Sequence, residues 1–132
     1  MALYDPYKKY SSSSDVVSSI VEDWVCELVE PKHHAMSTAA SIDPFGNDID
    51  WVDRENQMIQ LMKERMGIGL SSPQIGNSYN MFVMTHSVLG DIGVYKPKII
   101  EVSDETVSMD EGCLSFPLLY VRLSRPAKIK VQ

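Results

Sequence analysis

Helix-forming and strand-forming patterns occupy different halves of this chain of 132 residues. Apolar residues recur at helical spacing in residues 15–28 and again in residues 50–66, and the pattern changes after Gly76. Short β-rich runs then cover residues 79–85, 93–95, 98–102, 119–123 and 127–131. Because helices and strands do not alternate, we predict an α+β fold, with N-terminal helices followed by antiparallel strands, rather than a βαβ fold.

The second helical segment carries the clearer boundary signals. Asp50 is a suitable N-cap, and Gly67 is a suitable stop. Its apolar stripe, which we expect to face the core, consists of Trp51, Met58, Ile59, Met62 and Met66. The first helical segment belongs to an N-terminal extension over residues 1–27, ahead of a single domain over residues 28–132.

Composition argues against several classes of protein. The chain has 12 Lys and Arg against 18 Asp and Glu, a net charge of −6, so we expect no direct nucleic-acid binding and no attachment to anionic membranes. The longest uncharged stretch is interrupted by glycines and Pro73, which makes it unsuitable as a membrane span. Residues 1–10 show no signal-peptide or transit-peptide pattern, and we expect a cytoplasmic protein.

One unusual segment, G-I-G-L-S-S-P-Q at residues 67–74, lies where the second helix should end and the strands begin. Its glycines permit a positive φ and allow another backbone or a ligand to approach closely. On its own, the segment is also explained by a helix C-cap followed by a turn.

A second unusual segment, E-G-C-L-S at residues 111–115, contains one of the two cysteines. Asp110 and Glu111 precede Cys113, and their negative charge would raise the pKa of the thiol, which disfavours a free nucleophile. A bound metal ion would instead deprotonate the thiol. We therefore interpret Cys113 as a metal ligand, whereas Cys26 lacks a partner at metal-ligand spacing and is predicted to be an ordinary thiol.

Together these segments resemble the first two signature motifs of peptide deformylases, G-φ-G-L-A-A-x-Q and E-G-C-L-S. The second motif matches at every position of residues 111–115. The first departs at Ser71 and Ser72, where the family usually has alanines. We expect alanine at both positions to leave turnover close to unchanged. The resemblance extends over residues 28–132.

The resemblance implies a metal-dependent hydrolase that removes the N-terminal formyl group from formyl-methionine of nascent polypeptides. Cys113 would be a ligand of a divalent metal ion, usually Fe²⁺, with Zn²⁺ and Ni²⁺ as alternatives. The Gln74 amide and the backbone N–H of Leu114 would donate to the formyl oxygen as it becomes an oxyanion. Formyl-methionyl nascent peptides are the implied partner, and the ribosome is a second candidate.

The resemblance also implies how the methionine of the substrate is held. Ile68 and Gly69 would offer an apolar wall and backbone edges, and Gly69 therefore belongs to both the catalytic and the substrate-binding set. Glu111 is the remaining substrate-binding candidate. A bacterial cell, or one infected by a phage, is the expected location.

The family's third motif, H-E-x-x-H, supplies two further metal ligands and lies well after the cysteine. Here 132 − 113 = 19 residues follow Cys113, and none is a histidine. We therefore expect this chain to be incomplete or inactive alone, and the coding DNA beyond Gln132 tests that expectation. Two alternatives remain: a deformylase-like module that binds N-terminal methionine peptides without chemistry, and an acyl-transfer enzyme with Cys113 as nucleophile.

Overall fold

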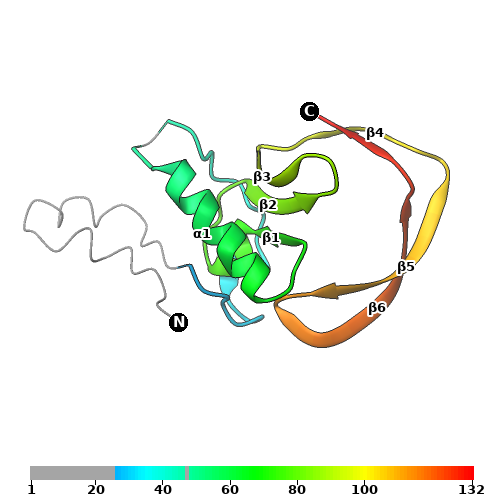
Figure 1. Cartoon of the computed structure of the whole chain (residues 1–132), viewed down its shortest axis with the longest axis horizontal. Helices are drawn as coiled ribbons and strands as arrows, with labels where there is room; N and C mark the ends of the chain where they lie inside the picture. The colour runs from blue at the N-terminus through cyan, green and yellow to red at the C-terminus, as the bar shows by residue number, and fades with distance from the viewer. Residues whose placement is uncertain (1–25, 47) are drawn as a thin grey trace, which may run out of the picture.

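The structure is a computed structural model that describes residues 26–46 and 48–132. In these residues one α-helix precedes antiparallel sheets, which confirms the predicted α+β class with a single α-helix and mostly strands (Figure 1). The predicted helix over residues 15–28 lies outside the described residues except at its end, where residues 26–28 are not helical. The elements are the 3-10 helix His34–Met36, α1 (Trp51–Glu64), β1 (Gly69–Ser71), the 3-10 helix Ser72–Ile75, β2 (Met81–His86), β3 (Gly90–Tyr95), β4 (Ile99–Val102), β5 (Thr106–Cys113), β6 (Phe116–Pro126) and β7 (Ile129–Val131).

Helix α1 begins as the sequence predicts. The Asp50 carboxylate accepts a hydrogen bond of 3.1 Å from the Asp53 N–H, so it caps the first turn. The predicted core position of Met66 is wrong: its side chain is 92% exposed. The reason is that α1 ends at Glu64 and Met66 adopts a left-handed φ of 57°, so Met66 does not continue the apolar stripe of the helix.

The core forms where α1 packs against the three-stranded sheet β1-β2-β3 (Figure 1). Its buried apolar side chains are Cys26, Met58, Leu61, Met62, Leu70, Ile75, Tyr79, Met81 and Val83. Glu55 of α1 ties the helix to β3, because its carboxylate accepts hydrogen bonds from the Gly93 N–H at 3.1 Å and the Tyr95 hydroxyl at 2.5 Å. Burial and this bond raise the pKa of Tyr95, which keeps the hydroxyl protonated as a donor.

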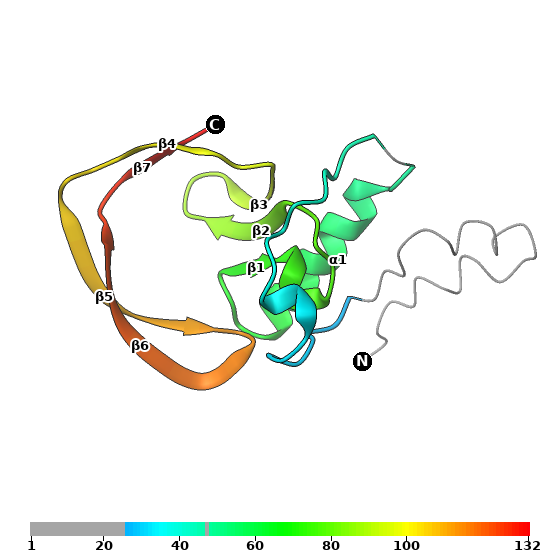
Figure 2. The same ribbon diagram turned by 180° about the vertical axis from the view of Figure 1, so that it is seen from behind.

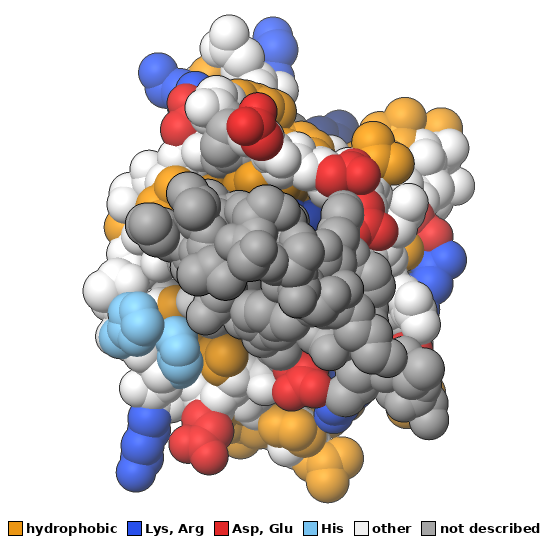
Figure 3. Space-filling view, turned by 90° about the vertical axis from the view of Figure 1, so that its left-hand side faces the viewer, with side chains coloured by type: hydrophobic (Ala, Val, Ile, Leu, Met, Phe, Trp, Pro, Cys, Tyr) orange, Lys and Arg blue, Asp and Glu red, His pale blue; other side chains and the backbone are white. Residues whose placement is uncertain are grey.

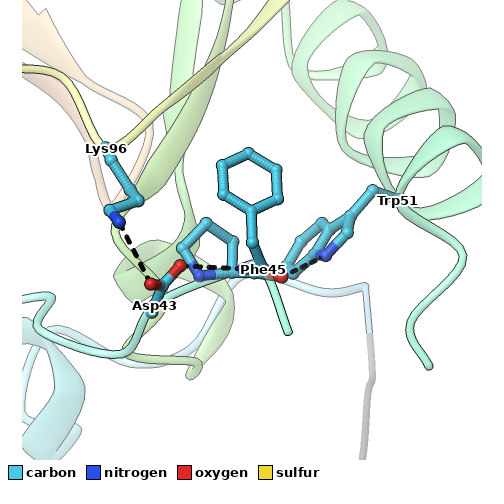
Figure 4. Close-up of polar contacts among 5 residues, drawn as sticks. Asp43, Phe45, Trp51 and Lys96 are labelled. Carbon is cyan, nitrogen blue, oxygen red and sulfur yellow. Dashed lines mark hydrogen bonds and ion pairs between the residues drawn. The ribbon is translucent and has the colours of Figure 1, made fainter. Parts of the chain in front are cut away.

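The segment before α1 is held by polar contacts that involve Asp43, Phe45, Trp51 and Lys96 (Figure 4). The Trp51 indole N–H donates to the Pro44 carbonyl at 2.5 Å, and the Phe45 N–H donates to Asp43 at 2.9 Å. Lys96, just after β3, forms an ion pair of 3.0 Å with the same Asp43 carboxylate. These contacts join the segment before α1 to the end of β3.

The remaining strands form two ribbons, β4 with β7 and β5 with β6, which curve away from α1 (Figures 1 and 2). Strand β5, which pairs with β6, is not among the β-rich runs that the sequence pattern predicts. Acidic residues and Gly112 lower the strand propensity of β5. Opposite charges face each other across the two strands, since Arg122 of β6 forms an ion pair of 3.3 Å with Asp110 of β5.

No helix in residues 26–46 and 48–132 has the length and apolar character needed to cross a membrane. On the face shown in Figure 3, basic, acidic and apolar side chains of the described residues are interspersed.

Replacing Met58 by alanine is expected to destabilise the protein by about 2–5 kcal/mol, because the side chain is fully buried between α1 and the sheet. Val52→Ala, at a position of the same helix that is 74% exposed, is the control and should change stability by roughly 0.5 kcal/mol or less. Urea unfolding followed by circular dichroism measures both. Equal losses for the two variants would show that α1 does not pack as described.

Candidate active site

The two motif segments meet in space although their key side chains are 39 positions apart in the sequence. The amide nitrogen Nε2 of Gln74 lies 3.6 Å from the sulfur of Cys113 and donates to it. The same nitrogen donates to the hydroxyl of Ser115 at 3.1 Å. A glutamine from the first motif therefore faces the cysteine of the second.

Local backbone structure fixes where Gln74 lies. Strand β1 runs directly into the 3-10 helix Ser72–Ile75, with Pro73 in its first turn, and Gly76 ends that helix with a φ of 86°. The Ser71 N–H donates to Oε1 of Gln74 at 3.0 Å, and the Ser71 hydroxyl donates to the same oxygen at 3.1 Å. Because both bonds hold the oxygen, the nitrogen end of the amide is directed towards Cys113.

Cys113 lies at the end of β5, where the chain turns tightly into β6. Residues 114 and 115 form the turn, and Cys113 pairs with Phe116 across it. The cysteine is exposed, whereas Ser115 is buried with 5% exposure. The turn thus presents the sulfur to solvent and keeps the Ser115 hydroxyl inside, where it accepts from Gln74.

Gly67 allows the two motifs to approach each other. A Cβ at this position would lie 2.6 Å from Cδ1 of Leu114, closer than carbon atoms pack. Gly67 and Gly69 do not use the positive φ that glycine permits, since the positive-φ glycines of the described residues are at positions 46, 76 and 90. The close approach of Leu114, rather than backbone strain, explains the first glycine of the motif.

Ile68 and Gly69 lie at the edge of the three-stranded sheet. Gly69 is in β1, which pairs with β2 and stands at one end of the strand order β1-β2-β3. Ile68 is 77% exposed, whereas Leu70 is buried in the core. A Cβ on Gly69 would meet only the Val83 carbonyl oxygen, at 3.8 Å, so space is open beside this glycine.

Glu111 is bound by Arg125, which is not among the predicted site residues. Nε and Nη2 of Arg125 in β6 donate to its two carboxylate oxygens at 2.5 Å and 2.7 Å. The hydrogen bond from Arg125 lowers the pKa of Glu111 and keeps it ionised, and the same bond raises the pKa of Arg125. This bidentate pair joins β5 to β6 two residues before Cys113.

The two cysteines differ in environment. Cys26 is buried, and desolvation, followed by the charges of Glu64 and Glu27, raises its pKa to about 12. It is therefore an inert core thiol, as the sequence predicts. Cys113 is exposed and faces an amide donor, which leaves its sulfur accessible to a ligand.

The described residues offer a metal ion one thiolate rather than a complete ligand set. No group of three or more His, Cys, Asp or Glu side chains in residues 26–46 and 48–132 is arranged to hold a metal ion. Structural and catalytic Zn²⁺ sites normally take three or four protein ligands. Cys113 is the ligand that the motifs indicate among these residues.

Comparison with known proteins defines the class of the chain. The model of the polypeptide deformylase family matches residues 26–132. Peptide deformylase of Thermotoga petrophila is 42% identical over 76 residues, which are 58% of this chain and 46% of that protein. Peptide deformylase 1B, chloroplastic/mitochondrial, of Arabidopsis thaliana is 41% identical over 134 residues, covering 94% of this chain and 48% of that protein. The chain spans about half the length of these curated relatives.

Solved structures agree with the sequence matches. A plant peptide deformylase, PDF1B, superposes with a TM-score of 0.68 at 34% identity, covering 80% of this chain and 59% of that one. A probable peptide deformylase from synechococcus phage S-SSM7 superposes with a TM-score of 0.69 at 29% identity, covering 80% and 73%. The α+β fold is therefore similar to that of peptide deformylases, and in it the first motif places a glutamine beside the cysteine of the second. The chain belongs to the peptide deformylase family, whose members are metal-dependent hydrolases.

Proposed function

We propose that this protein removes the formyl group from the N-terminal formyl-methionine of nascent polypeptides. The reaction is the hydrolysis of an amide: water adds to the formyl carbon, the C–N bond breaks, and formate and a free amino terminus result. Family membership supports this activity. The proposed setting is the cytoplasm of a bacterial cell or of a cell infected by a phage, with the ribosome as the source of substrate.

One observation carries the proposal: the Gln74 amide nitrogen is held towards Cys113 from the opposite motif. An amide N–H is a suitable donor to a carbonyl oxygen that gains negative charge, and a donor fixed in advance needs no reorganisation during the reaction. The backbone N–H of Leu114, next to Cys113, is the proposed second donor. The formyl carbon would therefore lie close to the Cys113 sulfur.

The edge strand β1 supports binding of an extended peptide. An edge strand can pair with an incoming chain through its backbone, and the open space beside Gly69 allows such a chain to approach. The exposed side chain of Ile68 would contact the apolar methionine of the substrate. For Glu111, the pairing with Arg125 favours an indirect role in which it holds the β5–β6 turn beside the substrate.

Cys113 is the proposed metal ligand, and Fe²⁺ is the proposed ion, with Zn²⁺ and Ni²⁺ as alternatives that a thiolate also binds. The exposure of the sulfur supports this assignment. Its hydrogen-bond partner, the Gln74 amide, is not a base, which argues against Cys113 as an activated nucleophile.

Formate release from a formyl-methionyl peptide tests the proposal. The protein with its complete set of metal ligands, of which the described residues supply one, is given Fe²⁺, Ni²⁺ or Zn²⁺ under anaerobic conditions. The acetyl-methionyl peptide of the same sequence is the control. We expect formate from the formyl peptide, dependent on the added ion. Binding of the formyl peptide without formate release would instead indicate a binding module. Acyl transfer that is lost on alkylation of Cys113 would indicate a thiol enzyme.

A further inference from the structure

We propose that the Ser71 hydroxyl is a positioning group for catalysis, because it adds a second hydrogen bond to the Gln74 oxygen and so supports the orientation in which the amide nitrogen faces Cys113. This inference rests on the proposed deformylase function. It revises the expectation from sequence that alanine at position 71 leaves turnover close to unchanged. The family usually has alanine at this position, so the hydrogen bond from the Ser71 hydroxyl is a feature of this chain and is not general to the family.

The geometry separates Ser71 from its neighbour Ser72. The Ser71 hydroxyl donates to Oε1 of Gln74 at 3.1 Å, beside the bond of 3.0 Å from the Ser71 N–H. The hydroxyl of Ser72 is fully buried and donates to the Asn77 carbonyl at 2.9 Å instead. One serine therefore acts on the candidate catalytic side chain, and the other closes a local turn.

Two donors on one oxygen have two consequences for Gln74. A glutamine amide that can rotate would present its oxygen or its nitrogen to the substrate. The Ser71 N–H makes the rotated state unfavourable, because the amide nitrogen would then face a group that cannot accept a hydrogen bond, and the Ser71 hydroxyl adds a second bond to Oε1 in the observed state. Bonds accepted by the oxygen also polarise the amide and strengthen the bonds its nitrogen donates. Without the hydroxyl, the Ser71 N–H alone holds the Gln74 oxygen and alone polarises the amide.

Steady-state kinetics and NMR on the protein with its complete set of metal ligands test the proposal. Ser71→Ala should lower kcat by about 2- to 10-fold with KM nearly unchanged, the range expected for one hydrogen bond. Ser71→Thr should restore kcat, because it keeps the hydroxyl and suits the extended backbone at this position, where φ is −96° and ψ is 154°. Ser72→Ala is the matched control and should leave kcat unchanged.

The double variant Gln74→Leu with Ser71→Ala shows whether Ser71 acts on kcat through Gln74. If it does, Ser71→Ala should lower kcat no further than Gln74→Leu does alone. The side-chain amide signals of Gln74, assigned by their absence from Gln74→Leu, give a readout without turnover. They should shift in Ser71→Ala and stay in place in Ser72→Ala.

Three results would overturn the inference: unchanged kcat in Ser71→Ala, an equal loss in the Gln74→Leu background, or unmoved Gln74 amide signals. Absence of formate release from the parent protein is a different failure. It would overturn the proposed function, and with it the proposed effect of Ser71 on kcat.

Discussion

Cys113→Ala is expected to abolish metal-dependent formate release and to remove the metal ion from the purified protein. The reason is that a thiolate is a strong ligand for Fe²⁺, Zn²⁺ and Ni²⁺, whereas alanine offers no donor. The variant should fold normally, because the Cys113 side chain is exposed and its removal leaves no buried cavity. Metal content by mass spectrometry and formate release, measured on the same sample, check both effects.

Cys26→Ala is the matched control for this prediction. Its thiol is buried, and its raised pKa keeps it protonated at neutral pH, so it should bind no metal ion. We expect parent metal content and parent turnover in the folded fraction of Cys26→Ala, with some loss of stability from the small cavity. Full turnover of Cys113→Ala at the parent metal content would refute the ligand assignment.

Local patterns were sufficient to predict α1 and the class of fold. The cap at Asp50 and the buried positions Met58 and Met62 follow from spacing alone, because a helix repeats its contacts every three or four residues. Met66 shows where this reasoning ends. Its spacing fits the helix, but α1 ends two residues earlier, at Glu64, and Met66 adopts a φ of 57° that the spacing does not predict.

Contacts between segments far apart in the sequence were beyond prediction from local patterns. The pairing of Glu111 with Arg125 depends on how β5 and β6 lie against each other, and β5 itself was missed because acidic residues and Gly112 weaken its signal. The motifs indicated that Gln74 and Cys113 belong to one site. Which end of the amide faces the sulfur depends on hydrogen bonds from Ser71, which no periodicity reveals.

Gln74→Leu is expected to lower kcat by roughly 10²- to 10³-fold while KM changes little, the loss seen when one oxyanion donor is removed. A donor of this kind forms its stronger bond in the transition state, as negative charge develops on the formyl oxygen. Its loss therefore lowers kcat more than it weakens binding. Initial rates over a range of formyl-methionyl peptide concentrations separate the two constants.

The leucine variant also removes the contacts that Gln74 makes within the protein. Its loss leaves the Ser71 N–H without the Oε1 acceptor and the buried Ser115 hydroxyl without its donor, so stability should fall by about 1–3 kcal/mol. Thermal unfolding measures this loss, and kinetics below the unfolding transition keep it apart from the loss of kcat.

Gln74→Glu separates donation to the substrate from support of the motif. The carboxylate is nearly isosteric and keeps an acceptor for the Ser71 N–H and hydroxyl, but it places an oxygen where the Gln74 nitrogen faces Cys113. If the N–H donor is what matters, Glu should lower kcat at least as much as Leu, because a negative charge opposes the developing oxyanion. A glutamate variant with near-parent kcat would assign Gln74 to support of the turn, and an effect confined to KM would assign it to substrate binding.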